Sequence, residues 1–444
     1  MHGSTTRIGG RTGRIGLVAA LLAGALATTA GCAGGDRSAV ADPGGSVPTL
    51  TWWAMPNFEE PAAKVVAACN AKADGAWRIR TRYLPQQPEV QRERLVRQLA
   101  ARDQSVNLVQ LDMVWAPEFA RAGWILPFTG TDAAAVREGV LSGPLKSVTW
   151  RGQTWAAPMI SGAQLMWYRR SRLAAVGLDP ARQDVSWDQL IDGLSRLPEG
   201  QRGIGVQTAR YEGYTVFVGA LLAGAGGAVV NDAGAPVIDS PAGAQAARVI
   251  AKLAHSPAAD PALPTMDEET GKALVFNGKA SAMVNWGYVY SDALKRAEAD
   301  PAFRPVLADL AWARYPRTVA GRPSAPPLGG SNIAVGAYTP PALRKAAFAA
   351  AACLTSTEAQ RTLMVEASMP AARSAVYDDP AVRKVQPFAD LLRQSVNDGV
   401  PRPQIPAYTA VSDALQRAFT PPAGVDPALS PARAGEFIRN RSRI

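Results

Sequence analysis

The sequence has very little histidine and cysteine for its length: 444 residues contain two His and three Cys. His2 lies in an N-terminal leader, described below, so the body of the chain keeps only His255. This scarcity argues against a His-rich metal centre, and it leaves His255 as the only histidine available to a Ser-His-Asp triad. In "AKLAHSPAAD" it follows a helical pattern, where capping a helix C-terminus is the expected role. We expect neither a metal nor a cofactor.

The chain is basic but lacks a concentrated basic run. Lys and Arg number 47 against 37 Asp and Glu, and the net charge is +10. No stretch interleaves basic residues with aromatics, and no Gly-rich phosphate loop precedes a helix. Nucleic acid is therefore not an expected partner.

The N-terminus predicts export. Arg7, Arg11 and Arg14 precede the apolar run "IGLVAALLAGALATTA", which is too short to span a bilayer with charged flanks. Residues 1–31 are typical of a secretory signal, and no later run predicts a transmembrane helix. Their removal takes three arginines and no acid, which leaves 44 basic and 37 acidic residues and a net charge of +7.

The signal ends in Ala30-Gly31-Cys32, which resembles the lipobox of bacterial lipoproteins, although Thr29 departs from the usual residue. The resemblance implies a lipid on Cys32 and an anchor on the extracytoplasmic face of the cell membrane. Residues 32–47 are small and Gly-rich, as a flexible tether requires. The alternative is ordinary cleavage that leaves a free thiol.

Cys69 and Cys353 remain, and both lie in helical patterns. In an exported chain, two such cysteines favour a disulfide over metal binding or catalysis. The alternative is two separate buried thiols.

The first part of the chain alternates strands and helices. Strands are predicted at 50–53, 79–83 and 106–111, with helices at 59–73 and from Pro88 between them. This order predicts an α/β fold with a parallel sheet, whose ligands bind outside the carboxyl ends of the strands.

Strand and helix patterns resume beyond a predicted hairpin at 150–156, including a helix capped by Ser186 and strands at 282–286 and 333–335. A chain of this length predicts two lobes joined by a hinge, with a ligand cleft between them. We assign residues 48–158 and 305–368 to the first lobe, and residues 159–304 and 369–444 to the second.

Asp112 ends an apolar strand, where a carboxylate is costly to desolvate unless it is hydrogen-bonded. It is a candidate acceptor for ligand hydroxyls, or the N-cap of the turn near Trp115. Glu212, in the polar segment "RYEGY", is a second acceptor or a solvated loop acid. Trp286 is a candidate for stacking on a bound ring or a core residue, and Arg373 is a ligand donor or the partner of a nearby aspartate.

Further polar and aromatic candidates occupy segments expected to rim the cleft. They are Trp53, Asn57, Glu59, Gln86, Gln164 and Tyr214.

Several segments together resemble the extracellular sugar-binding proteins of ABC importers. They are "WYRRSRLAAVGLDPARQDVSWDQL", "GKASAMVNWGY", "GGSNIAV" and "MPAARSAVYDDPAV". Within that family, "LDMVWAPEFARAGWILPF" and "EGYTVFVGALLAGAGGAVV" resemble mycobacterial trehalose-recycling lipoproteins. The resemblance covers nearly all of the chain beyond the signal.

The resemblance implies a monomeric, non-enzymatic receptor that binds a disaccharide or oligosaccharide and delivers it to membrane permease subunits. It implies that Asp112, Glu212, Trp286 and Arg373 line the sugar site, and that Cys69 and Cys353 are paired. One position departs from the trehalose-recycling pattern, since Gly162 stands in place of an Asn.

Two other functions fit some of these residues. A secreted glycoside hydrolase would use Asp112 and Glu212 as its pair of carboxylates, at a fixed separation. A receptor for peptides or amino acids would pair Arg373 and the acids with the charged ends of its ligand. The candidate stacking Trp favours a sugar over both.

Overall fold

The computed structural model describes residues 47–56 and 58–441, which build two main β-sheets with helices around each. The first sheet has the strand order β2-β1-β3-β12-β4, and β7 pairs with β12 as a sixth strand. Its strands are β1 (Thr49–Ala54), β2 (Arg78–Tyr83), β3 (Leu108–Asp112), β4 (Ile125–Leu126), β7 (Ala157–Ala163) and β12 (Leu328–Gly336).

The predicted alternation of strands and helices is confirmed. β1 pairs in parallel with both β2 and β3, while β12 is antiparallel to β3. The connections are α1 (Glu59–Lys72) and α2 (Pro88–Ala100), and Pro88 opens the second helix as expected.

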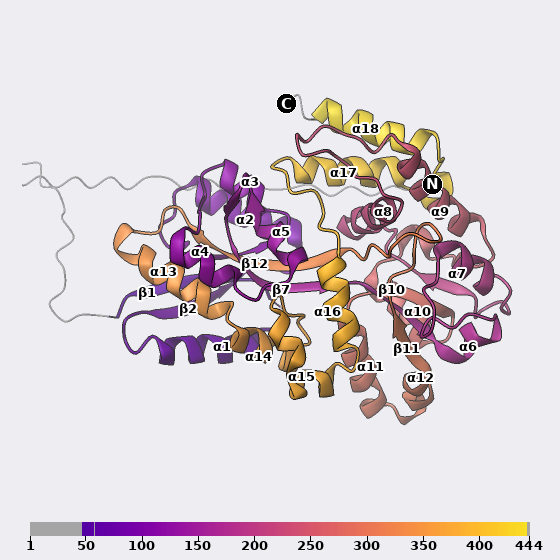
Figure 1. The fold of residues 1–444 in the computed structure, drawn as a ribbon, viewed down its shortest axis with the longest axis horizontal. Helices are drawn as coiled ribbons and strands as arrows, with labels where there is room; N and C mark the ends of the chain where they lie inside the picture. The colour runs from indigo at the N-terminus through magenta and orange to yellow at the C-terminus, as the bar shows by residue number, and fades with distance from the viewer. Residues whose placement is uncertain (1–46, 57, 442–444) are drawn as a thin grey trace, which may run out of the picture. The chain divides into compact units, whose positions relative to one another are not determined.

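β1 reads as an almost unbroken apolar run because both faces of its sheet are covered. Leu50 and Trp52 pack with residues of α1 and of α13 (Pro341–Leu354), whereas Trp53 packs with Leu95 of α2 on the other face. Figure 1 shows these helices around β1, β2 and β12.

The second sheet has the order β11-β8-β10-β9. Its strands are β8 (Leu165–Arg169), β9 (Gly203–Gly205), β10 (Ala280–Asn285) and β11 (Leu310–Ala313). Its core includes apolar residues of α7 (Trp187–Leu194), α8 (Glu212–Gly224) and α9 (Pro241–His255). Ser186 forms the predicted cap of α7, with its side chain accepting from the Gln189 amide, and His255 is the last residue of α9.

The remaining helices complete the two halves. They are α3 (Ala116–Arg121), α4 (Gly130–Arg137), α5 (Ser142–Val148), α6 (Arg170–Ala175), α10 (Glu268–Phe276), α11 (Tyr288–Ala299), α12 (Arg304–Asp309), α14 (Thr357–Ala367), α15 (Pro380–Val385), α16 (Ala389–Asp398), α17 (Tyr408–Phe419) and α18 (Leu429–Arg441). The predicted hairpin is β5 (Thr149–Trp150) with β6 (Gln153–Thr154). Within 47–56 and 58–441, no helix has both the length and the apolar character needed to cross a bilayer.

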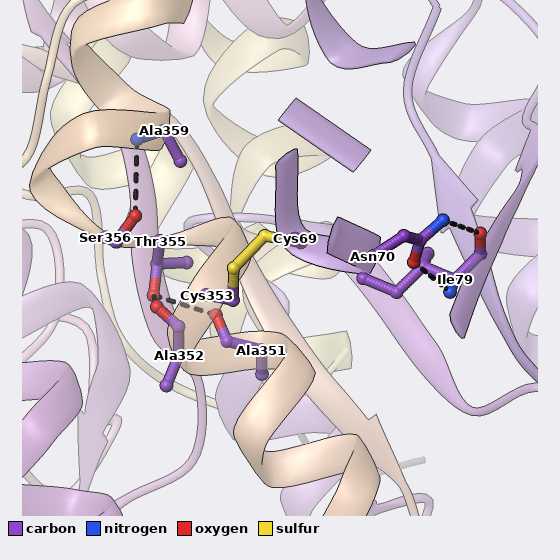
Figure 2. The surroundings of a disulfide bond; sticks show 9 residues. All are labelled: Cys69, Asn70, Ile79, Ala351, Ala352, Cys353, Thr355, Ser356 and Ala359. Atoms are coloured by element: carbon purple, nitrogen blue, oxygen red, sulfur yellow. Dashed lines mark hydrogen bonds between the residues drawn. A yellow bond between two sulfur atoms is a disulfide. The ribbon is translucent and has the colours of Figure 1, made fainter. Parts of the chain in front are cut away.

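A disulfide joins Cys69 of α1 to Cys353 of α13, with the two Cα atoms 5.9 Å apart, which confirms the predicted bridge (Figure 2). Beside it, the Asn70 amide closes the free edge of β2. Its Nδ2 donates to the Ile79 carbonyl at 3.1 Å, and its Oδ1 accepts from the Ile79 amide at 2.6 Å. The edge strand thus has partners for backbone groups that would otherwise be open to another strand.

Within the described residues, the chain passes three times between the half built on the first sheet and the half built on the second, and the three crossings are hydrogen-bonded to one another. Gln164 lies between β7 and β8, residues 314–327 join β11 to β12, and residues 399–407 join α16 to α17. The Gln164 amide donates to the Pro327 carbonyl, and the Val400 amide donates to that of Pro326. These adjoining segments have the position expected for a hinge.

The predicted lobe boundaries need correction at three places. β7 extends the first sheet to Ala163, beyond the predicted limit at 158, because it pairs with β12. β11 belongs to the second sheet, since it pairs with β8. Part of the C-terminal region packs on the first half, where α16 contacts α5 and β7, whereas α17 contacts α8 in the second. The predicted signal and all but the last residue of the tether lie outside the described residues.

Candidate functional site

Arg402 joins the two halves of the molecule. It lies in the third crossing, and its side chain is 8% exposed. Nη1 donates to Glu212 Oε1 at 2.6 Å, and Nη2 donates to Asp112 Oδ1 at 3.0 Å. Because Asp112 ends a strand of the first sheet and Glu212 begins a helix of the second half, one guanidinium bridges both.

Asp112 is held at the carboxyl end of β3, as its sequence predicted. Its backbone pairs with Ser331 of β12, and its Oδ1 also accepts from the Val114 amide at 3.2 Å, so it stabilises the turn after the strand. Burial raises the pKa of Asp112, and the charge of Glu212 adds to the rise, while Arg402 and the Val114 amide oppose it.

Glu212 is the first residue of α8, so its predicted loop position is wrong. The positive end of the helix dipole favours a carboxylate there. Its Oε1 accepts from the Tyr408 hydroxyl, and its Oε2 accepts from Ser412 Oγ at 2.6 Å. We call Asp112, Glu212, Arg402, Tyr408 and Ser412 the Arg402 cluster.

A pocket of about 770 Å³ opens beside this cluster. The first half contributes Trp150 and Arg151, the second half contributes α8 and residues 227–234, and residues 400–407 lie between them. Two buried polar atoms of the 400–407 segment, Arg402 Nε and Gln404 Oε1, have no hydrogen-bond partner within the described part of the chain. Both residues line the pocket, so its wall includes polar side chains of the third crossing.

Trp286 follows β10 and is partly buried. Its Nε1 lies 3.5 Å from Glu268 Oε1, and its ring covers Gly329, where an added Cβ would come within 2.5 Å of the ring. Ser331, two residues further along β12, pairs with Asp112. Asp112 and Trp286 thus reach the same short stretch of β12 from different sheets.

Gly162, the departure noted in the sequence, pairs with Gly329 in this stretch. A Cβ at residue 162 would lie 3.0 Å from Pro370 Cγ, tighter than ordinary side-chain contacts. Packing against Pro370 therefore accounts for a glycine at this position.

Arg373 lies apart from the Arg402 cluster and from Trp286. Its side chain is buried and donates to three backbone carbonyls: Nε to Thr355 at 2.8 Å, Nη2 to Ala135 at 3.0 Å, and Nη1 to Glu138. Its predicted pairing with an aspartate is wrong, because Asp378 pairs with Arg383 and Arg393, and Asp379 pairs with Arg361.

Trp53 and Tyr214 are core residues, so their prediction as cleft residues is wrong. Both are 0% exposed. Trp53 lies below the guanidinium of Arg82, which is 4.3 Å from its ring centroid. The Tyr214 hydroxyl donates to the Phe419 carbonyl at 2.6 Å.

None of Asp112, Glu212 and Trp286 is among the residues that line the pocket, and the described members of the predicted rim lie apart from it as well. Glu59 and Gln86 are exposed, at the start of α1 and just before α2. Gln164 is fully buried in the first crossing and donates to Gln207 at 3.2 Å, so it is not a rim residue. Asn57 and Cys32 lie outside the described residues.

Sequence reasoning missed Arg402, Tyr408 and Ser412. The available signal was the segment "VPRPQIPAY", in which an arginine stands between two prolines at the junction of two helical patterns. Among the described residues, no group of three His, Cys, Asp or Glu side chains is placed to hold a metal ion.

The fold is that of two-lobed binding proteins. Maltose-bound T. maritima MalE3 superimposes with a TM-score of 0.75 at 25% identity, covering 88% of this chain and 99% of that one. MalE of Xanthomonas citri, a sugar-binding protein, superimposes with a TM-score of 0.73 at 14% identity, covering 89% of this chain and 98% of that one. The α/β two-lobe prediction is confirmed.

The model of the bacterial extracellular solute-binding protein family matches residues 79–361, and the chain belongs to that family. A probable ABC transporter-binding protein of Deinococcus radiodurans is 27% identical over 367 residues, which cover 79% of this chain and 84% of the relative. The family binds solutes and is not a family of enzymes. The expectation of a non-enzymatic protein is confirmed, and the glycoside hydrolase alternative is wrong.

Proposed function

We propose that this protein is the receptor of an ABC importer and binds an uncharged, hydroxyl-rich solute, a sugar, in the pocket beside Arg402. The observation that carries the proposal is the bridge from Arg402 to Asp112 and Glu212, which come from different halves of the molecule. A ligand in contact with this bridge would touch groups whose geometry depends on how the halves meet.

The chemistry of the pocket supports a neutral ligand. Sugar hydroxyls both donate and accept. Arg402 lines the pocket as a charged donor, and the two carboxylates bonded to it, Asp112 and Glu212, are acceptors beside the pocket. Trp150 supplies an aromatic surface for the apolar face of a sugar ring. An amino acid or peptide would pair its termini with charged groups, and the charge of Arg402 is already engaged by two carboxylates. Arg121, Arg151 and Asp232 also line the pocket, so a dipeptide is the competitor that tests this point.

The size of the pocket supports a disaccharide or oligosaccharide of the trehalose type. Its volume falls within the ~300–1,000 Å³ that small-molecule sites occupy. Relatives support the same class: T. maritima MalE3 holds maltose, and a mannitol-binding protein of Pseudomonas aeruginosa is 26% identical over 129 residues, 28% of this chain and 29% of the relative.

We further propose that the mature protein is a monomer held on the extracytoplasmic face of the cell membrane by a lipid on Cys32, where it delivers its sugar to permease subunits. The lipobox-like Ala30-Gly31-Cys32 and the Gly-rich tether support this location.

The test is calorimetric titration of the protein with trehalose, maltose, cellobiose and mannitol, and with a dipeptide as the charged competitor. We expect one sugar to bind stoichiometrically and unaltered. Asp112→Asn and Glu212→Gln, which keep the shape of each side chain, should each weaken that binding about 10- to 100-fold, because a hydrogen bond to a charged group contributes ~1.5–3 kcal/mol.

A matched control is Arg92→Met, which breaks a partly buried arginine–carboxylate pair with Glu118, outside the pocket lining. This variant should bind the sugar as the unmodified protein does. Normal sugar binding by both the Asp112 and Glu212 variants, or binding of the dipeptide alone, would overturn the proposal.

A further inference from the structure

Three arginines follow one another along the exposed edge strand of the first sheet. β2 reads "RIRTRY" and lies at the end of the strand order, with only β1 beside it. Since side chains alternate across a strand, Arg78, Arg80 and Arg82 lie on one face, and all three are exposed. We call these residues the arginine row.

Each arginine of the row is positioned by the residue opposite it on β1. Arg78 Nε donates to Thr49 Oγ1 at 2.8 Å, and Arg80 Nε donates to Thr51 Oγ1 at 3.0 Å. The third guanidinium lies over the Trp53 ring, and Arg94 of α2 lies 5.7 Å from the same ring centroid. The side chains are thus ordered by neutral partners.

Among the described residues, the three arginines of the row and Arg94 form no ion pair with a carboxylate. Arg383 and Arg393, by contrast, each contact two aspartates. A pocket of about 590 Å³ lies at the row, lined by Thr49, Asn70, Arg78, Ile79 and Arg80. Uncompensated guanidinium groups around a hollow are suited to phosphate oxygens, which they bind through forked hydrogen bonds.

The row lies where the predicted tether joins the folded body. Arg78 pairs with Thr49, and its amide donates to the Pro48 carbonyl at 2.9 Å. Cys32 is sixteen residues before Pro48. A chain of that length spans at most about 55 Å, so a lipid on Cys32 would keep this edge of the sheet within that distance of the membrane surface.

We infer that the arginine row binds the phosphate-bearing headgroups of anionic phospholipids and fixes how the receptor lies on its membrane. A basic patch adds electrostatic attraction to anionic lipids, which a lipid anchor alone does not supply. The inference rests on the proposed membrane location, but it is independent of which solute binds.

The test removes the lipid so that only the protein surface can bind. The mature chain, residues 32–444 with Cys32→Ser, is mixed with phosphatidylcholine vesicles containing phosphatidylglycerol or with phosphatidylcholine vesicles alone, and bound protein is measured by flotation. We expect binding to the anionic vesicles only, and loss of that binding in high salt.

Replacing the row by glutamine (Arg78→Gln, Arg80→Gln and Arg82→Gln together) should weaken binding to anionic vesicles about 100-fold, or about fivefold for each arginine. The double variant Arg78→Gln, Arg80→Gln spares the Trp53 contact and should weaken it about 25-fold. The control replaces three exposed arginines outside β2 by glutamine: Arg170, Arg182 (which pairs with Asp179) and Arg433. It removes the same charge and should change binding less than twofold.

Equal binding to both kinds of vesicle, or equal losses in the row and control variants, would overturn the inference. Binding of the row to a soluble acidic protein but not to vesicles would do so as well. Sugar titration of the same samples keeps the two proposals separate, because the row variants should bind sugar normally.

Discussion

Arg402 and Arg373 are two arginines with the same exposure, 8%, in opposite surroundings. Arg373 donates to three backbone carbonyls, while Arg402 donates to two carboxylates from different halves of the molecule. The first arrangement fixes neighbouring segments of one half to each other. The second couples two halves through side chains that a ligand can reach.

The difference also appears in the pKa of each guanidinium. Burial lowers the pKa of Arg373, and only the charge of Glu138 opposes this. Burial acts in the same direction on Arg402, but Asp112, Tyr408 and Glu212 outweigh it and raise the pKa well above its ordinary value. Arg373 is therefore held among neutral acceptors, whereas Arg402 is held among acids.

The largest expected effect on stability is that of Arg373→Met, which removes a donor from three carbonyls, although that of Thr355 keeps a bond from Gln360 Nε2. Since a buried group that loses its partner costs ~1–3 kcal/mol, we expect the free energy of unfolding to fall by about 3–5 kcal/mol. Urea unfolding measures this, and sugar titration of the folded fraction should be unchanged. Arg361→Met, which breaks an exposed pair with Asp379, is the control and should cost less than ~1 kcal/mol. Loss of sugar binding by folded Arg373→Met would remove the contrast with Arg402.

Arg402→Met should show the reverse pattern, a smaller loss of stability and a large loss of sugar binding. It leaves Asp112 and Glu212 without their shared cation, but both carboxylates keep some contact with water, at 24% and 26% exposure. We expect a loss of about 2 kcal/mol in the free energy of unfolding, less than the ~3–5 kcal/mol of a fully buried pair. Sugar binding should be undetectable by titration. Normal sugar affinity in this variant would show that the bridge serves only stability.

The smallest effect is a pH dependence that belongs to Asp112. In the folded protein the pKa of the Asp112 carboxyl group is raised above its ordinary value of 3.8. The native state therefore binds the carboxyl proton more tightly than the unfolded state does. The free energy of unfolding, relative to that of Asp112→Asn, should therefore fall as pH rises from 3.8 through the raised value. The fall is ~1.4 kcal/mol for each unit by which the pKa is raised.

Urea unfolding of both proteins across the acidic range measures this difference. A difference that grows with pH would mean that Arg402, rather than burial, controls this carboxyl group.

Local patterns in the sequence predicted much of the fold. β1 to β3 and the helices between them follow from apolar periodicity and from Pro88. The lobe boundaries were missed because β7 and β11 pair with strands far away in the sequence, β12 and β8, and local pattern does not encode such pairing.

Only part of the candidate site could be predicted. Asp112 was found because strand ends have a fixed place in a parallel sheet. Arg402 was missed because its two partners are 190 and 290 residues away. Trp53 and Tyr214 were misassigned because a large aromatic with one polar atom suits a core as well as a cleft.

The bond between Cys69 and Cys353 closes a covalent ring around all the residues between them, including every strand of the second sheet. A protease that cuts once inside this ring leaves one molecule, whose pieces separate only after reduction. A single cut in a surface loop between Cys69 and Cys353 therefore leaves the second sheet covalently joined to the first.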